Sequence, residues 1–228
     1  MIDALIDKQD SFEIVRDQIS AILATEVASQ MALATAATKD PNDWKLRIFE
    51  ERSNPWEQWL EDSPADISPI INVWYDNSTF DLKAGSTVER QKTTGIFNID
   101  CYGYGISQDD GGTGHLPGDR EAALEVQKAV RLVRNILMAG TYTYLELRGL
   151  VWRRWVDKVT IFQPQDIRNA QQIINVQKIV GSRIAFNVIF NEFSPQVPFE
   201  TLELVSVDVK RTEDGQIIAE ADYQYPLS

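Results

Sequence analysis

The chain has 228 residues, of which 43% are hydrophobic and 25% charged, proportions typical of a globular protein rather than a disordered one. Acidic residues outnumber basic ones by 34 to 22, and the net charge of −12 disfavours tight binding to the phosphate backbone of a nucleic acid. The single cysteine, Cys101, has no partner for a disulfide within the chain.

The first residues carry Asp3 and Asp7, where a signal peptide has basic residues followed by an apolar run. No uninterrupted apolar stretch approaches the roughly 18 residues that span a bilayer. We therefore expect no membrane partner, and a protein that stays in the cytoplasm of the cell that makes it.

The first predicted element is a helix that begins after Asp10 and runs to about Ala36. Asp10 and Glu13 have the spacing of a capping box. Apolar residues then recur at helical intervals, at Phe12, Val15, Ile19, Ile22 and Leu23.

Residues 38–68 read as an irregular insertion, because three prolines interrupt them. Trp44, Trp56 and Trp59 lie within it. Two interpretations of these tryptophans are equally favoured. They form a lid that packs on the protein's own core, or they form a surface that docks a neighbouring protein, since tryptophan is enriched at interface hot spots.

Strands and a second helix are predicted after the insertion. Residues 69–76 and 94–105 alternate as strands, with Cys101 on an apolar face, and residues 107–118 form a glycine-rich loop. The second helix is predicted from Asp119 to about Met138, with Gly140 as its terminator. Later strands are predicted at 142–147, 155–163, 179–193, 202–209 and 217–223, the last two joined by a turn at 213–215.

This order predicts one α+β domain over residues 1–228, with a mostly antiparallel sheet, two main helices packed on one face and a long C-terminal hairpin. Catalytic motifs are missing: His115 is the only histidine, and Gly111–Gly114 lacks the Lys-Ser/Thr ending of a phosphate loop. Asp109 and Asp110 do not have calcium-loop spacing. We expect no enzyme activity, no metal and no cofactor, with a small hydrolase as the weaker alternative.

The most unusual short stretch is Trp152-Arg153-Arg154-Trp155. Strand alternation would place Trp152 and Arg154 on one face and Arg153 and Trp155 on the other, with one tryptophan in the core. Such a stretch suits stacking on single-stranded nucleic acid or pairing with acidic groups of a neighbouring subunit. The acidic net charge favours the subunit interface.

The chain resembles the tail terminator and tail-completion proteins of long-tailed bacteriophages over about residues 69–209. The resemblance rests on the order of six segments: INVWYD, TTGIFNIDCYGYG, AVRLVRNILMAGTYTYL, VWRRWV, FNVIFNEFSPQ and TLELVSVDVKR. The first helix and the insertion at 38–68 are additions to the smaller members of that family.

The resemblance implies a structural virion protein that forms a homohexameric ring, caps the tail tube, ends its polymerisation and joins the tail to the head connector. Its partners would be further copies of itself, the tail tube protein and the head–tail connector protein. DNA would pass through the lumen without specific binding. Alternatives are another neck, connector or baseplate protein, or a module that binds a peptide along a sheet edge.

Overall fold

The computed structural model describes two separate sets of residues. Contacts divide the chain into a main unit, Ile6–Ser194, and a second unit formed by Met1–Leu5 and Pro195–Ser228. The structure describes residues 9–60, 67–81, 90–105, 108–109, 115–116, 118–164 and 179–193, with the backbone of 204–210 and 217–224.

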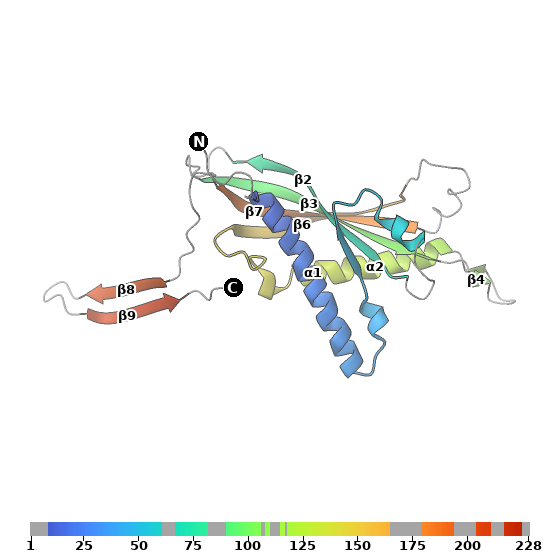
Figure 1. The fold of residues 1–228 in the computed structure, drawn as a ribbon, viewed down its shortest axis with the longest axis horizontal. Coiled ribbons are helices and arrows are strands. Elements are labelled where there is room, and N and C mark those ends of the chain that lie inside the picture. The colour runs from blue at the N-terminus through green and yellow to red at the C-terminus, as the bar shows by residue number, and fades with distance from the viewer. Residues whose placement is uncertain are drawn as a thin grey trace. The chain divides into compact units, whose positions relative to one another are not determined.

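A five-stranded sheet with the order β1-β2-β3-β7-β6 forms the centre of the main unit (Figure 1). Every neighbouring pair is antiparallel except β1 and β2, which run parallel. The strands are β1 Arg47–Glu50, β2 Ile70–Phe80, β3 Arg90–Tyr104, β6 Val151–Phe162 and β7 Ile179–Phe193. The predicted α+β class and mostly antiparallel sheet are confirmed.

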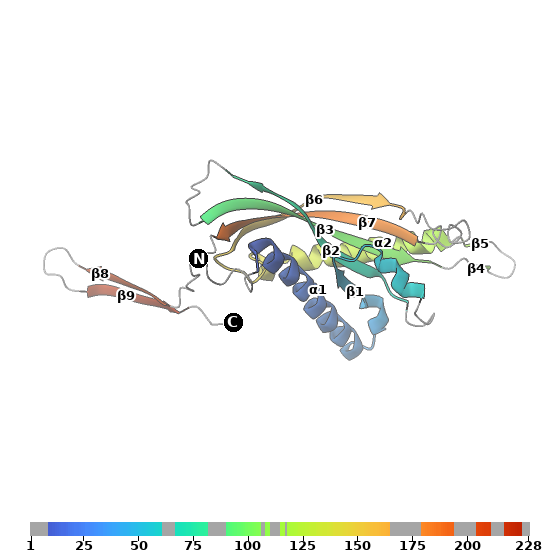
Figure 2. The same cartoon turned by 45° about the horizontal axis from the view of Figure 1, so that its top comes forward.

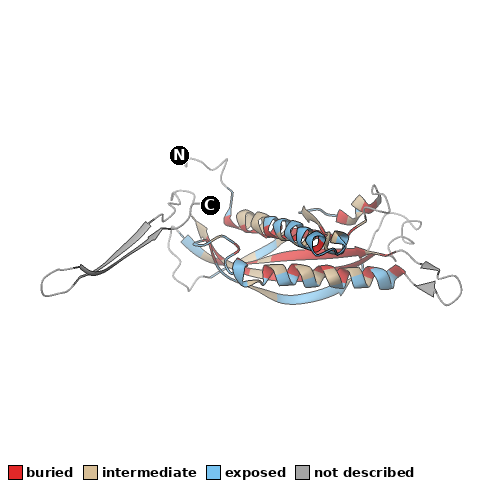
Figure 3. Ribbon diagram, turned by 90° about the horizontal axis from the view of Figure 1, so that it is seen from below, coloured by how far each residue is buried: buried red, intermediate tan, exposed pale blue. Residues whose placement is uncertain are grey.

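Two helices, α1 Ser11–Ala36 and α2 Gly118–Leu137, cover the same face of this sheet (Figure 3). The predicted capping box starts α1: the Asp10 side chain accepts from the backbone of Glu13, and the Glu13 carboxylate accepts from the Asp10 backbone N–H. Between the helices and the sheet lies one apolar core that includes Val15, Ile19, Val133, Phe97, Ile99, Cys101, Ile184 and Phe186.

Two glycines allow α2 to lie directly on β3. A Cβ at Gly103 would come within 2.4 Å of the Ala122 carbonyl oxygen, and a Cβ at Gly105 within 2.0 Å of the Gly118 carbonyl oxygen. Both contacts are with the helix backbone, which cannot move aside as a side chain can. The repeated Tyr-Gly pattern of this strand is therefore explained by close helix–strand approach.

The second half of α1 extends beyond the sheet, beside a short 3₁₀ helix, η1 Pro41–Trp44 (Figures 1 and 2). There Leu33 is 61% exposed, whereas Val15 and Ile19 in the first half are fully buried. By length and composition alone, α1 is apolar enough to cross a membrane, with a mean hydropathy of 1.3, and a third of its most apolar window is buried. Because a core helix passes the same test, the predicted lack of a membrane partner stays a prediction.

Several sequence-based boundaries were wrong. Residues 142–147 are not a strand: η4, Gly140–Tyr142, is followed by turns in which Leu145 and Glu146 have positive φ. Leu145 is nevertheless fully buried, so its apolar side chain belongs to the core although no strand forms there. Gly140 adopts no left-handed conformation and is not the terminator of α2.

Strand boundaries also differ from the prediction. The insertion at 38–68 contains the short strand β1 and a second 3₁₀ helix, η2 Pro55–Leu60, and β6 begins four residues before the predicted start. In the predicted loop, β4 Gln108–Asp109 pairs with β5 His115–Leu116. Asp110 and Gly111–Gly114 lie outside the described residues.

The second unit contains an antiparallel hairpin of β8 Leu204–Lys210 and β9 Ile217–Gln224. This confirms the predicted C-terminal hairpin. The predicted turn at 213–215 lies outside the described residues.

Candidate interface at the β6 edge

The face of the sheet opposite the two helices is polar and aromatic. Its centre is Asp100 on β3, whose side chain is only 4% exposed. The Arg183 guanidinium donates to both carboxylate oxygens, at 2.7 and 2.9 Å. Trp74 Nε1 and the Tyr102 hydroxyl also donate to Asp100, at 3.0 and 3.3 Å. The buried carboxylate is therefore fully paired.

The electrostatics of this cluster agree with a structural role. The hydrogen bonds to Asp100 raise the pKa of Arg183, and burial raises the pKa of Tyr102, next to the same carboxylate. The Arg183 guanidinium lies over the Trp74 ring at 4.7 Å and over the Phe162 ring at 5.5 Å. Because Phe162 belongs to β6, this cluster helps to hold β6, at the edge of the sheet, against the neighbouring strands.

Strand β6 is an edge strand of 12 residues. Within the described part of the chain it pairs with β7 alone, so one side of its backbone is free to accept another strand (Figure 2). Most of its side chains are exposed after Val151, which is buried. A long edge without a covering element is a template for strand pairing between chains.

A bulge in β6 changes the faces predicted for the Trp-Arg-Arg-Trp stretch. The register shifts between Val151 and Arg153, and Arg153 then pairs with Ile189 while Trp155 pairs with Asn187. Arg153 and Trp155 share the open face, as predicted, and the guanidinium lies 5.5 Å from the Trp155 ring.

Neither tryptophan of this stretch belongs to the core, so that part of the prediction was wrong. Trp152 is 53% exposed and lies 5.2 Å from Lys92 Nζ, and Trp155 is half-buried. Strand β6 thus carries two aromatic rings outside the core, Trp152 with Lys92 beside it and Trp155 with Arg153 beside it.

Arg154 points to the opposite, helix-bearing side and is taken up within the chain. Its guanidinium donates to the backbone carbonyls of Tyr142 and Ala139, the latter at 2.6 Å. Burial lowers the pKa of Arg154. This arginine ties β6 to the segment that follows α2, whereas the adjacent Arg153 is exposed.

An open apolar groove lies between β6 and α2. Val159 and Ile161 form one wall and are 43% and 62% exposed. Val126 and Val130 form the other wall, and the volume is about 220 Å³. Arg131 and Arg134 line the same groove from α2. The β6 edge therefore offers an apolar groove flanked by cations on the helix side, and Arg153 and Lys158 on the open face.

Two tryptophans of the insertion, Trp56 and Trp59, share a hydrophobic cluster with Phe162, at the opposite end of β6 from Trp152. Trp59 is 7% exposed, its Nε1 donates to the Ser68 carbonyl at 3.0 Å, and its ring packs near Tyr104. Trp56 packs against Tyr102 at 5.1 Å. Both act as a lid on one end of the open face, whereas Trp44 is half-buried in η1 beside α1. The structure does not bring these three together with Trp152 and Trp155.

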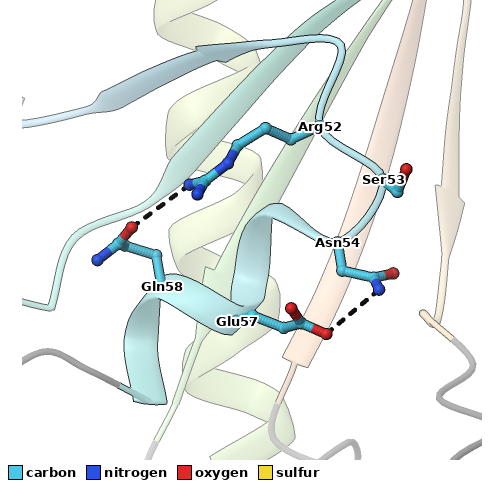
Figure 4. Close-up of a pocket in the computed structure, with 5 residues that line it drawn as sticks. All are labelled: Arg52, Ser53, Asn54, Glu57 and Gln58. Carbon is cyan, nitrogen blue, oxygen red and sulfur yellow. Dashed lines mark hydrogen bonds between the residues drawn. The ribbon is translucent and has the colours of Figure 1, made fainter.

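A second hollow, about 250 Å³, lies between β1 and η2 (Figure 4). The polar groups that line it bond to one another: Arg52 donates to Gln58 at 3.3 Å and Asn54 donates to Glu57 at 3.2 Å. This hollow has no convergent unpaired groups of the kind that bind a substrate.

Sites for chemistry are sparse in the described ranges. Cys101 is fully buried in the apolar core, as predicted, and burial raises the pKa of its thiol above the ordinary value. In the same residues, no group of three or more His, Cys, Asp or Glu side chains is placed to hold a metal ion.

The sequence interpretation missed the Asp100–Arg183 pair and the β6–α2 groove. The alternation in β3 and β7 did place Asp100 and Arg183 on polar faces, but only the register, which aligns residues 83 apart, makes them partners.

No protein-family model matches the chain, and no curated protein matches its sequence.

Proposed function

We propose that this protein is a structural assembly protein of a phage tail. In this role it forms a ring of identical copies that caps the tail tube, ends tube polymerisation and joins the tail to the head connector. The observation that carries the proposal is the β6 edge, a 12-residue strand with a free side and with exposed aromatic, basic and apolar side chains.

A ring requires two different surfaces on each copy that fit one another. The β6 edge supplies one of them, because it carries the exposed side chains of Arg153 and Lys158. The other would be an acidic surface of the next copy, which the excess of 34 acids over 22 bases provides. A contact between a basic and an acidic surface favours head-to-tail contacts over symmetric ones.

The net charge supports the same proposal. With −12 per copy, a closed ring repels DNA, so a genome that crosses the lumen is not retained by it. This role needs no catalytic group, and the buried carboxylate of Asp100 on the open face is paired with Arg183.

The proposal is tested by adding the purified protein to polymerising phage tail tubes and imaging them by negative stain. We expect rings at one end of the tubes and tubes of limited length. A protein that stays monomeric, does not bind tubes and leaves their length unchanged would contradict the proposal.

A further inference from the structure

The C-terminal hairpin has two faces of different chemistry. Its register places apolar positions opposite apolar positions along one face: Val205 with Tyr223, Val207 with Ala221 and Val209 with Ala219. On the other face, polar and acidic positions are opposite one another: Ser206 with Asp222 and Asp208 with Glu220. The hairpin is therefore amphipathic across its two faces.

A two-stranded hairpin of this composition needs a surface to pack against. An isolated two-stranded hairpin is at best marginally stable in water. Asp208 and Glu220 are directly opposite, and like charges in that position destabilise a strand pair. Residues 195–228 contain seven acids and two bases, a net charge of −5. An apolar surface and a source of positive charge would remove both deficits.

The β6 edge provides both, with the same alternation. On the open face it presents Arg153 and Lys158, which pair with Ile189 and Ala185 of β7. On the helix side it presents Val159 and Ile161. A strand added to this edge would continue both faces, so an apolar face would meet apolar residues and an acidic face would meet cations.

We propose that the C-terminal hairpin of a second copy of this chain adds to the free edge of β6. Its apolar face extends the groove formed with α2, and its acidic face, with Asp208 and Glu220, lies on the same side of the extended sheet as Arg153 and Lys158. Either hairpin strand fits within the length of β6, since β8 and β9 have seven and eight residues and β6 has 12. This inference rests on the proposed function, because it names the contact that joins the copies.

A charge exchange between two full-length variants tests the contact. The first variant carries Arg153→Glu with Lys158→Glu, and the second carries Asp208→Lys with Glu220→Lys. Each alone places like charges across the contact, so we expect the concentration for half-dissociation, measured by light scattering, to rise at least about tenfold. Mixing the two variants restores opposite charges at every contact, and we expect assembly to recover.

A matched control variant reverses two exposed cations outside β6, Lys39→Glu with Arg120→Glu, and should assemble like the wild type. If either charge variant assembles as well as the wild type, the hairpin contact is overturned while the proposed function stands. If the variants behave as expected but the wild type neither binds tail tubes nor limits their length, the proposed function fails and the contact stands. A wild type that is monomeric at every concentration overturns both.

Discussion

The two faces of the central sheet are built on different principles. The face under α1 and α2 is mainly apolar, and Phe97, Ile99 and Phe186 on it are fully buried. The opposite face is organised around one ion pair, Asp100 with Arg183, and around aromatic rings that cover it. Adjacent residues of the same strand, such as Ile99 and Asp100, therefore have unrelated roles.

This difference separates folding from assembly. Burial of apolar area on the covered face supplies the stability of the main unit. The open face and the β6 edge hold polar and half-exposed aromatic groups, the composition of a surface that meets partners. Substitutions on the covered face should therefore affect unfolding, and those on the β6 edge should affect association.

The largest expected effect is on the covered face. Phe186→Ala removes a fully buried ring and should lower the free energy of unfolding by about 3–5 kcal/mol, measured by urea denaturation. The control Thr160→Ala changes an exposed β6 residue and should stay within about 0.5 kcal/mol of the wild type. Similar losses for both variants would remove the distinction between the two regions.

The ion pair of the open face should have a smaller effect. Arg183→Met leaves the buried Asp100 carboxylate with only Trp74 and Tyr102 as donors, and should cost about 2–3 kcal/mol in the same measurement. Adding Asp100→Asn removes the uncompensated charge and should recover most of that loss. If the double variant is no more stable than Arg183→Met, the pair does not act as described.

At the β6 edge, stability and assembly should separate. Trp152→Ser changes a side chain that is 53% exposed, so we expect a change of less than about 0.5 kcal/mol in unfolding free energy. The same substitution should weaken self-association, measured by analytical ultracentrifugation. A large loss of stability would instead assign Trp152 to the fold.

The last expected effect appears only at alkaline pH and lies on the covered side. The Tyr142 hydroxyl donates to Glu26, and this bond, with burial, raises the pKa of Tyr142 to about 12 from 10.0. A pKa raised on folding stabilises the fold below pH 10 and loses that contribution as pH rises toward 12. The slope is at most about 1.4 kcal/mol per pH unit, and Tyr142→Phe should remove it. An unchanged slope would contradict the assignment.

Local patterns predicted much of the covered face. The capping box of Asp10 and Glu13 and the alternation around Cys101 depend only on neighbouring residues, so both were predicted correctly. β1 was missed because it has only four residues, too few for a periodic pattern. It forms a strand because it pairs in parallel with β2, which the local sequence does not reveal.

The candidate interface was harder to predict, for a geometric reason. Arg153 and Trp155 were placed on a shared face correctly, but the bulge after Val151 shifts the preceding residue, and bulges leave no mark in a short sequence pattern. The bonds of Arg154 within the chain could not be predicted, because its partners are backbone carbonyls, which any sequence offers; its role at an interface stays a prediction.

The central claim is that copies of this chain associate through the free edge of β6. Amide hydrogen exchange tests it most directly, measured on the wild type at a dilute and at an assembling concentration. The account predicts that β6 amides facing away from β7 exchange rapidly when dilute and become protected on assembly. Assembly without any added protection in residues 151–162 would contradict it.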